Sequence, residues 1–207
     1  MARPQTITDE QILSAARSCF LRHGPAVAVS RIAEQLGVSH VALLHRCGSK
    51  EEILRRAFAV SAPDVIADYR NGPAQGGSAK ELEQLLEATL SFLRALVPGL
   101  VVLRAAGTPL GERAKGAEAP TRTIRRELAG WLRRARADGL QVAQPEAWAE
   151  LLLGTLEARC FNAYLGGEEF VEGSDRAFVR TLVRTLVSQS RTPPPRRRAG
   201  NVAGGKP

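Results

Sequence analysis

The most specific spacing of residue types in the chain lies in the segment IAEQLGVSHVALLHR, residues 32–46, and the chemistry it would support is contact with DNA. Ile32 and Ala33 would face inward, and the small Ala33 would let two helices approach closely. Gly37 is placed for a tight left-handed turn, which any larger side chain would resist. Ser39 is placed to cap the following helix. The segment therefore predicts a helix-turn-helix, although a plain helical hairpin uses a glycine in the same way.

Histidine and cysteine side chains in the same region could instead form a metal site. Cys19 and His23 lie four residues apart on one predicted helix, and His40, His45 and Cys47 follow. Cys19 also falls on the apolar stripe of its helix, where a free cysteine acts as a small hydrophobic residue. We therefore expect no metal and no cofactor, and we expect Cys47 to fill the core, with redox sensing as the alternative if it is exposed. Three widely spaced cysteines give no disulfide framework and fit a reducing compartment.

Apolar residues recur at steps of three and four almost throughout the chain, so the sequence predicts an all-α protein. Three helix starts, at Thr8, Ser49 and Ser78, fit the capping box, in which side chains at the first and fourth positions satisfy orphan amides. Pro98 and Gly99 are expected to end a helix, followed by a short apolar segment and a loop to Pro120. The predicted helices cover about residues 9–22, 30–36, 39–46, 50–69, 82–96, 124–135, 145–164 and 174–190.

The charge of the chain is concentrated at its two ends. Lys and Arg number 29 and Asp and Glu number 21, which gives a formal charge of +8 and favours a nucleic-acid partner. Residues 1–50 hold six basic and three acidic residues, and the Pro-, Gly- and Arg-rich residues 191–207 hold five basic and no acidic ones. We expect this tail to be disordered. Neither a membrane-spanning apolar stretch nor a secretory signal is evident, so we expect a cytoplasmic protein without membrane contact.

The runs ILSAARSCFLRHG and VSRIAEQLGVSHVALLHRCGSKEEIL resemble the N-terminal domain of the tetracycline-repressor (TetR) family across about residues 10–55. The resemblance depends on the order of small groups of residues along the chain. These are Ala15-Ala16 with Phe20, then Gly24, Ile32-Ala33, Gly37-Val38-Ser39 and finally Ser49-Lys50-Glu51. The rest of the chain is similar to the family only in the number and length of its helices.

The resemblance implies an N-terminal three-helix helix-turn-helix domain and a larger helical domain that binds a ligand and dimerises. It implies a transcriptional regulator and not an enzyme, a repressor released from a palindromic DNA operator by a small molecule. The division expected from it is a DNA-binding domain over 1–49, a connecting helix over 50–71, a ligand-binding and dimerisation domain over 72–190 and the tail over 191–207.

The resemblance also places residues on the DNA. The leading face of the recognition helix would offer Val41 and Ala42 to thymine methyl groups and His40 to a purine or a phosphate. Lys50 would contact the phosphate backbone, which fixes register without reading sequence. The expected DNA-binding residues are Arg31, Ser39, His40, Val41, Ala42, Leu44, His45, Arg46 and Lys50.

Several positions depart from the family pattern. Family members usually carry a tyrosine at Leu44, threonines at Ala42 and near Val27 and Ala28, and an aromatic residue at Cys47. Hydroxyl groups at such positions donate to phosphate or cap a helix, and these side chains cannot. More of the affinity for DNA must then come from the basic side chains of Arg31, Arg46, Lys50 and Arg3. We therefore expect DNA binding to depend steeply on salt concentration.

The larger domain offers residues for a pocket and for a dimer. Arg104 and Arg159 each interrupt an apolar stretch, so each is either exposed or paired with an anion from the protein or from a ligand. The expected ligand-binding residues, which would suit an apolar ligand but also fit plain core packing, are Phe92, Leu96, Leu103, Arg104, Trp131, Trp148, Leu152, Leu156, Arg159 and Phe161. Two apolar faces on the last two long helices predict a homodimer through those helices, on Leu151, Leu152, Leu153, Leu156, Val179, Leu182, Val183, Leu186 and Val187.

Two other classes of protein stay open. A dimeric small-molecule-binding protein with degenerate, non-specific DNA binding would explain Leu44, Ala42 and Ala28. A helical enzyme is the weaker alternative, because the chain contains no HExxH, GxSxG or phosphate-loop motif.

Overall fold

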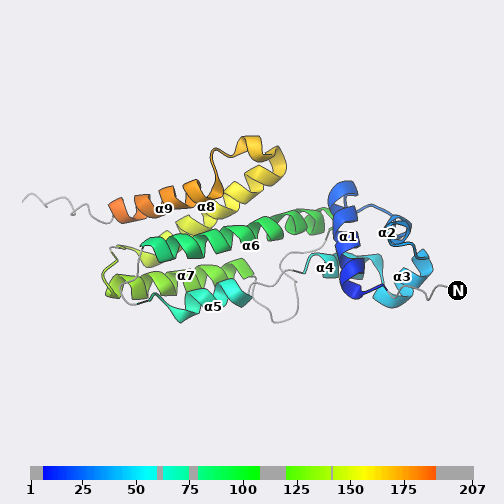
Figure 1. Ribbon diagram of the computed structural model, residues 1–207, viewed down its shortest axis with the longest axis horizontal. Coiled ribbons are helices and arrows are strands. Elements are labelled where there is room, and N and C mark those ends of the chain that lie inside the picture. Colours follow the sequence, from blue (N-terminus) through cyan, green and yellow to red (C-terminus); the bar gives the residue numbers. More distant parts are fainter. Residues whose placement is uncertain (1–6, 60–62, 75–78, 108–119, 141, 190–207) are drawn as a thin grey trace, which may run out of the picture.

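The computed structural model describes residues 7–59, 63–74, 79–107, 120–140 and 142–189, which form two groups of helices joined by one long helix (Figure 1). The smaller group contains α1 (Asp9–His23), α2 (Val29–Leu36), α3 (His40–Cys47) and α4 (Lys50–Ala57). The larger group contains α5 (Pro63–Asn71), α6 (Ala79–Ala105), α7 (Pro120–Ala137), α8 (Pro145–Gly166), the 3-10 turn η1 (Glu168–Phe170) and α9 (Asp175–Gln189). No strand occurs in these ranges, and the predicted all-α fold, a helix-turn-helix domain with a larger helical domain, is confirmed.

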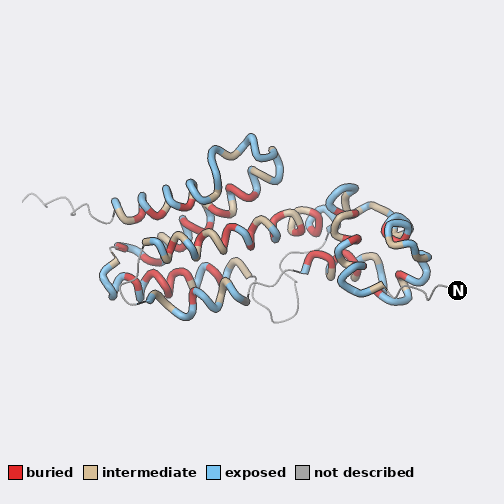
Figure 2. Tube along the Cα trace, in the orientation of Figure 1, coloured by how far each residue is buried: buried red, intermediate tan, exposed pale blue. Residues whose placement is uncertain are grey.

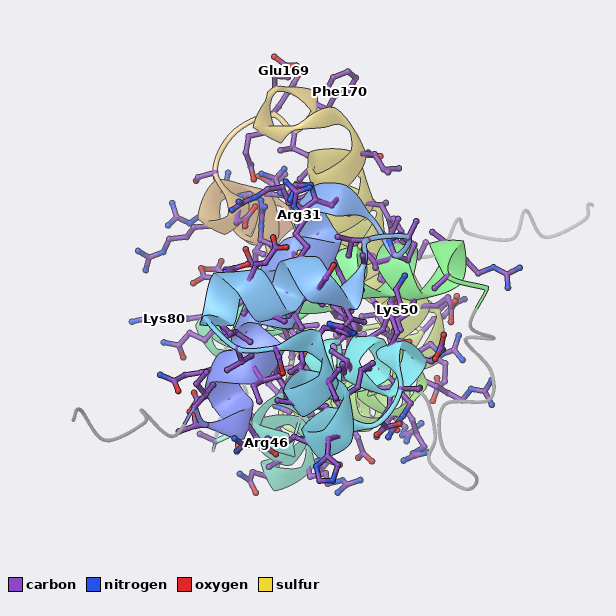
Figure 3. The ribbon with its side chains drawn as sticks, turned by 90° about the vertical axis from the view of Figure 1, so that its right-hand side faces the viewer. Arg31, Arg46, Lys50, Lys80, Glu169 and Phe170 are labelled. Carbon is purple, nitrogen blue, oxygen red and sulfur yellow. The ribbon has the colours of Figure 1, made fainter. Side chains whose placement is uncertain are left out.

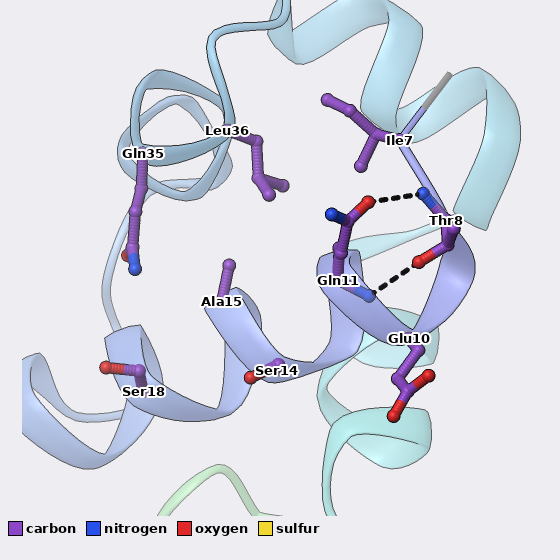
Figure 4. A pocket seen from close by; sticks show the side chains of 9 residues that line it. All are labelled: Ile7, Thr8, Glu10, Gln11, Ser14, Ala15, Ser18, Gln35 and Leu36. Carbon is purple, nitrogen blue, oxygen red and sulfur yellow. Dashed lines mark hydrogen bonds between the residues drawn. The ribbon is translucent and has the colours of Figure 1, made fainter. Parts of the chain in front are cut away.

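Helices α1 to α4 form what we call the reading head. The side chain of Thr8 caps α1 and closes a capping box with Gln11, as the sequence predicts (Figure 4). The four helices enclose a small apolar core around Phe20, Ile32 and Ile53, none of which is accessible to solvent. α4 contributes to this core, so the reading head extends beyond the expected boundary at residue 49.

The larger domain is arranged along α6. In Figure 1, α5 and α7 lie on one side of α6 and α8 and α9 on the other, and Figure 2 shows the buried residues between them. Leucines from α6, α7 and α8 belong to the same buried cluster as Trp131. Tyr69 of α5 and Thr89 of α6 share a buried hydrogen bond of 2.7 Å between their hydroxyl groups, which satisfies both inside an apolar core.

Two helix boundaries differ from the sequence prediction. The helix expected over 50–71 is divided into α4, which ends at Ala57, and α5, which begins at Pro63, a residue that fits the first turn of a helix. α6 continues through Pro98 to Ala105 instead of ending at Pro98. Proline removes only one helical hydrogen bond there, and the buried residues on both sides, Val97 and Val102, hold the helix together.

Of the helix caps predicted at Ser49, Ser174 and Ser78, two form hydrogen bonds in the structure and one lies outside the described residues. Ser49 accepts a hydrogen bond from the Glu52 amide, but the Glu52 carboxylate binds Arg55 and does not complete a capping box. Ser174 accepts from the Ala177 amide at the start of α9. Ser78, the loop over 108–119 and the basic tail over 191–207 lie outside the described residues.

Among the described helices, only α6 has the length and the mean hydropathy, 1.7, of a segment that could cross a membrane. Half of that apolar stretch is buried inside the protein, where it supplies residues to the cores of both groups. A core helix of the same length and hydropathy would also meet these criteria, and half of the apolar stretch of α6 is buried in the structure.

Candidate nucleic-acid interface

The turn between α2 and α3 has the geometry of a helix-turn-helix. Gly37 adopts the left-handed conformation (φ 67°, ψ 29°), which confirms the prediction from its position in the sequence. The amide of Val38 then donates to the carbonyl of Ala33 at 3.0 Å. Ser39 caps α3 by accepting a hydrogen bond of 3.1 Å from the amide of Ala42. Its hydroxyl is therefore engaged in holding the recognition helix.

The two faces of α3 have different surroundings. Leu43 and Cys47 are buried in the core of the reading head, and Leu44 is half-buried against it. The opposite face carries His40, Val41, Ala42 and His45, all exposed. Val41 is 63% exposed, although an aliphatic side chain gains free energy by leaving water. A helix that turns such a residue outward at its N-terminal end suits contact with thymine methyl groups in a major groove.

Two cations flank this exposed face. Arg31 in the first turn of α2 is exposed, and Lys50 at the first position of α4 is half-buried. Neither side chain forms a hydrogen bond or an ion pair with another residue in the described part of the chain. Figure 3 looks onto this end of the molecule, where Arg31, Arg46 and Lys50 lie spread around it. Arg31 and Lys50 are therefore available to phosphate groups.

Arg46, one of the expected DNA-binding residues, forms an ion pair within the reading head. Its guanidinium binds the carboxylate of Asp9 at 2.7 Å and donates to the carbonyl of Ile7, and Arg56 binds the same carboxylate at 2.9 Å. These hydrogen bonds, from Arg56 first and then Arg46, lower the pKa of Asp9. Arg46 thus fixes the end of α3 to the start of α1, and it shares the single Asp9 carboxylate with Arg56.

A groove on the reading head runs beside α1 and the end of α2 (Figure 4). It measures about 880 Å³ and is lined chiefly by hydroxyl and amide side chains, such as those of Ser14, Ser18 and Gln35. Its single charged lining residue is the carboxylate of Glu10. With no cation in its lining, this groove is not suited to the phosphate backbone of DNA.

The residues expected to bind a ligand do not all lie together. Phe92, Leu96, Trp131, Leu152 and Leu156 are buried in the core of the larger domain. Trp148 packs against the same core from its edge. The expected grouping is therefore partly reproduced, in a core that packing alone would also explain.

Three of the expected ligand residues lie elsewhere, and this corrects the grouping. Leu103 is buried in the core of the reading head, and Arg104 is exposed, because α6 continues past Pro98 and carries both out of the larger domain's core. Phe161 is exposed on α8. For Arg104, the alternative of solvent exposure is the correct one.

Arg159 is buried, and its anion comes from the protein. Its guanidinium donates to the Asp175 carboxylate at 2.8 Å and to the carbonyls of Glu172 and Gly173 at 3.1 and 2.6 Å, and it lies over the ring of Phe178. The Asp175 carboxylate also binds Arg94, and hydrogen bonds from Arg94 first and then Arg159 lower the pKa of Asp175. Each of the three guanidinium nitrogens of Arg159 thus donates a hydrogen bond within the protein, and Asp175 supplies its counterion.

The residues expected to form the dimer interface are mostly packed inside the protomer. Of these nine, only Leu151 is exposed, at 57%. The second apolar face predicted for the last two helices is used against α6 instead. A groove of about 630 Å³ lies between α8 and α9; its lining includes the small side chains Thr155, Ala158, Ala177 and Thr181 and the larger Arg159, Phe170 and Phe178.

The cysteines have no reactive surroundings in the structure. Cys19, Cys47 and Cys160 are all buried, and burial raises the pKa of the Cys160 thiol to about 11. Over the described residues, no group of His, Cys, Asp and Glu side chains is placed to hold a metal ion. Cys47 fills the core of the reading head, as expected.

The comparison with known proteins agrees with this geometry. Residues 12–57 match the sequence model of the bacterial regulatory proteins, tetR family. The TetR family transcriptional regulator PfmR from Thermus thermophilus is 20% identical over 88% of this chain and 96% of its own, with a TM-score of 0.60. A TetR/AcrR family regulator from Thermobifida fusca is 19% identical over 88% and 98% (TM-score 0.57), and the fatty acid degradation regulator FadR from Bacillus halodurans 18% over 87% and 98% (0.53). No curated protein sequence matches the chain.

The fold and the exposed recognition helix define a helix-turn-helix protein built like a transcriptional regulator. Over residues 12–57 its sequence is similar to the tetracycline-repressor (TetR) family, and its described helices share the fold of solved regulators of that family.

Proposed function

We propose that the protein is a homodimeric transcriptional repressor that binds a palindromic DNA operator and is released from it by a small-molecule ligand. The observation that carries this proposal is the exposed N-terminal face of α3, with Val41 63% exposed and with Arg31 and Lys50 unpaired beside it among the described residues. A reading head on each protomer would enter the major groove, with half-sites about 34–36 Å apart.

The exposed face assigns distinct roles on the DNA. On this proposal His40, Val41 and Ala42 contact base edges, and Arg31 and Lys50 contact phosphate groups. His40→Ala would then change which base is preferred at one position of each half-site, whereas Lys50→Ala would weaken all sequences alike. Binding of selected and random duplexes by both variants separates the two roles.

The dimer is proposed on the groove between α8 and α9. Its small wall residues permit close approach of a partner helix, and exposed apolar side chains continue the surface along α8 and η1: Leu151, Phe161, Tyr164, Leu165 and Phe170. A large apolar surface of this kind is typical of an interface. Figure 3 shows Phe170 projecting from the edge of the molecule. A two-fold arrangement would bury the α8 and α9 surfaces of both copies against each other.

A charged side chain in that groove tests the dimer. Ala158→Arg would place a large cation in the middle of the proposed interface and should convert the dimer to a monomer in sedimentation equilibrium. Ala137→Arg makes the same change at an exposed position on α7 and should leave the dimer intact. A dimer that persists in Ala158→Arg would contradict the placement.

The ligand site is proposed in the core around Trp131. This side chain is fully buried, and in the described structure its indole N–H has no hydrogen-bond acceptor. A buried donor without a partner costs about 1–3 kcal/mol, which a ligand oxygen would relieve. An apolar molecule with a hydrogen-bond acceptor is the chemistry that suits Trp131 and the leucines beside it.

Release of DNA follows if the ligand prefers a dimer whose reading heads are wrongly spaced. A ligand shifts that equilibrium only by the difference in its affinity for the two states, typically about 1–3 kcal/mol. Trp131→Phe keeps an aromatic side chain but removes the N–H, so it should weaken ligand-induced release while leaving the DNA affinity of the free protein unchanged.

The experiment that tests the proposal is selection of bound duplexes from a random DNA pool, with and without cell extract as a source of ligand. We expect one palindromic sequence, and its loss when extract is present. Equal binding to every sequence would instead support a dimeric ligand-binding protein with degenerate DNA binding, which the inward packing of Leu44 against the head's core favours.

A further inference from the structure

The last two turns of α6 form the joint between the larger domain and the reading head. Val102 and Leu103, near the end of α6, are buried in the core of the reading head. The first turns of the same helix belong to the core of the larger domain. In Figure 1, α6 runs the length of the larger domain and ends at α1. Any rotation of the head against the larger domain must therefore act on this end of α6.

Gly99 lets the reading head approach the backbone of α6. A Cβ atom at Gly99 would lie 2.7 Å from Cδ1 and 3.1 Å from Cβ of Phe58. Phe58 ends α4 and is fully buried. Its ring thus lies directly on the helix backbone, and the distance between α4 and α6 is set by the absence of a side chain at Gly99.

Arg17 of α1 fastens the head to the same turn of α6. Pro98 has no amide hydrogen, so the carbonyl of Arg94, four residues earlier, has no helical donor. One residue further on, the exposed carbonyl of Ala95 accepts a hydrogen bond of 2.6 Å from Nη2 of Arg17. The Arg17 guanidinium also lies 5.6 Å from the centroid of the Phe58 ring. A single half-buried side chain therefore contacts α6 and the end of α4 together.

The other side of this turn is held by the larger domain. Arg94, the residue before Ala95, binds the Asp175 carboxylate through two hydrogen bonds of 2.6 and 2.8 Å and the Glu168 carboxylate at 2.7 Å. Asp175 begins α9, and it also binds the buried Arg159 of α8. Adjacent residues of α6 are thus tied to α8 and α9 on one side and to the reading head on the other.

We propose that Arg17 is a positioning residue that fixes the angle of the reading head on α6, and that it thereby sets the spacing of half-sites that the dimer accepts. This inference rests on the proposed function, because it needs two heads bound to one DNA. Arg17 itself need not touch the DNA. Its bond to Ala95 is directional, and it acts on a helix turn that Pro98 leaves without its full set of hydrogen bonds.

The test uses the full-length protein and a series of duplexes made from the selected half-site, with the distance between half-site centres changed one base pair at a time. The unmodified protein should show a sharp optimum. Arg17→Gln should lose about tenfold in affinity at that optimum, the order of effect of one hydrogen bond to a charged group, and much less at neighbouring distances. The spacing profile should therefore flatten, while the base preference within each half-site stays unchanged.

Arg22→Gln is the matched control, because it removes the same charge from an exposed position on the same helix. It should lower affinity equally at all distances or not at all. A spacing profile for Arg17→Gln that keeps the shape of the unmodified protein's profile would overturn the inference, and thermal unfolding of both variants checks that each is folded. Failure of the proposed function would look different, because the unmodified protein would then show no spacing optimum.

Discussion

The reading head and the larger domain use their basic residues in different ways. In the larger domain, ion pairs join neighbouring helices: Arg70 with Glu127, Arg125 with Glu150, Arg133 with Glu146 and Arg94 with Asp175. In the reading head, Arg46 and Arg56 are likewise paired with Asp9. On the exposed face of α2, α3 and the start of α4, Arg31 and Lys50 have no ion-pair partner among the described residues.

We therefore propose that basic side chains without an ion-pair partner, and not basic residues in general, contact the DNA. A paired cation has already exchanged its counterion for a protein carboxylate, so phosphate binding would require breaking that pair. An unpaired one gains affinity by releasing the counterions of the DNA. The total charge of the chain, +8, does not separate the two kinds.

The largest effect on stability is expected in the larger domain, where arginines are paired with carboxylates. Asp175→Ala removes the carboxylate that Arg94 and Arg159 share and leaves Arg159 buried, 5% exposed, without a counterion. We expect a loss of about 2–4 kcal/mol in the free energy of unfolding, at the lower end because Asp175 is partly exposed. Urea unfolding measures it. Glu168→Ala, which removes an exposed partner of Arg94, should cost less than about 1 kcal/mol, and equal losses in both variants would argue against a buried network.

A smaller effect is expected on the salt dependence of DNA binding, measured by removing one cation from each region. Lys50→Ala should weaken DNA binding and reduce the magnitude of the slope of log K against log salt by about 1.8, because a dimer loses two phosphate contacts. Arg133→Ala removes a cation paired with Glu146 and should leave the slope unchanged. Filter binding or fluorescence anisotropy at several salt concentrations gives both slopes. The contrast between regions fails if the two variants behave alike.

The smallest expected effect is a change in the pH dependence of folding stability, and it is confined to acidic pH. The pKa of Asp175 is held below its ordinary value of 3.8, so the carboxylate contributes its full stability above that pH. As the pH falls below 3.8, the unfolded chain takes up the proton first, and this contribution is lost until the folded carboxylate is protonated too. The stability measured by unfolding between about pH 5 and pH 2.5 should therefore fall less steeply for Asp175→Asn than for the unmodified protein. Parallel curves would show that the Asp175 pKa is not lowered by folding.

The sequence predicts the reading head well because its geometry is local. The left-handed turn at Gly37 and the caps at Thr8 and Ser39 depend on residues three or four apart, and all of them are found. The role of Arg46 could not be predicted, because its partner Asp9 lies 37 residues away and only the packing of α3 on α1 brings them together.

In the larger domain the sequence predicts which helix faces are apolar, but it does not predict which core or which partner residues those faces contact. Leu103 lies in the core of the reading head because α6 continues past Pro98. The residues next to Pro98 in the sequence do not reveal that buried residues on both sides keep the helix intact. Arg159 and Asp175 lie 16 residues apart on different helices, so the sequence shows an arginine in an apolar stretch without showing its anion.

Salt dependence of binding to the selected palindrome tests the central claim, that the unpaired cations of the reading head hold the DNA. Arg31 and Lys50 on two heads give four phosphate contacts, which predicts a slope of about −3.6 or steeper in log K against log salt. A slope of about −2 or shallower would contradict the claim, because it would leave at least one of these cations on each head away from the DNA.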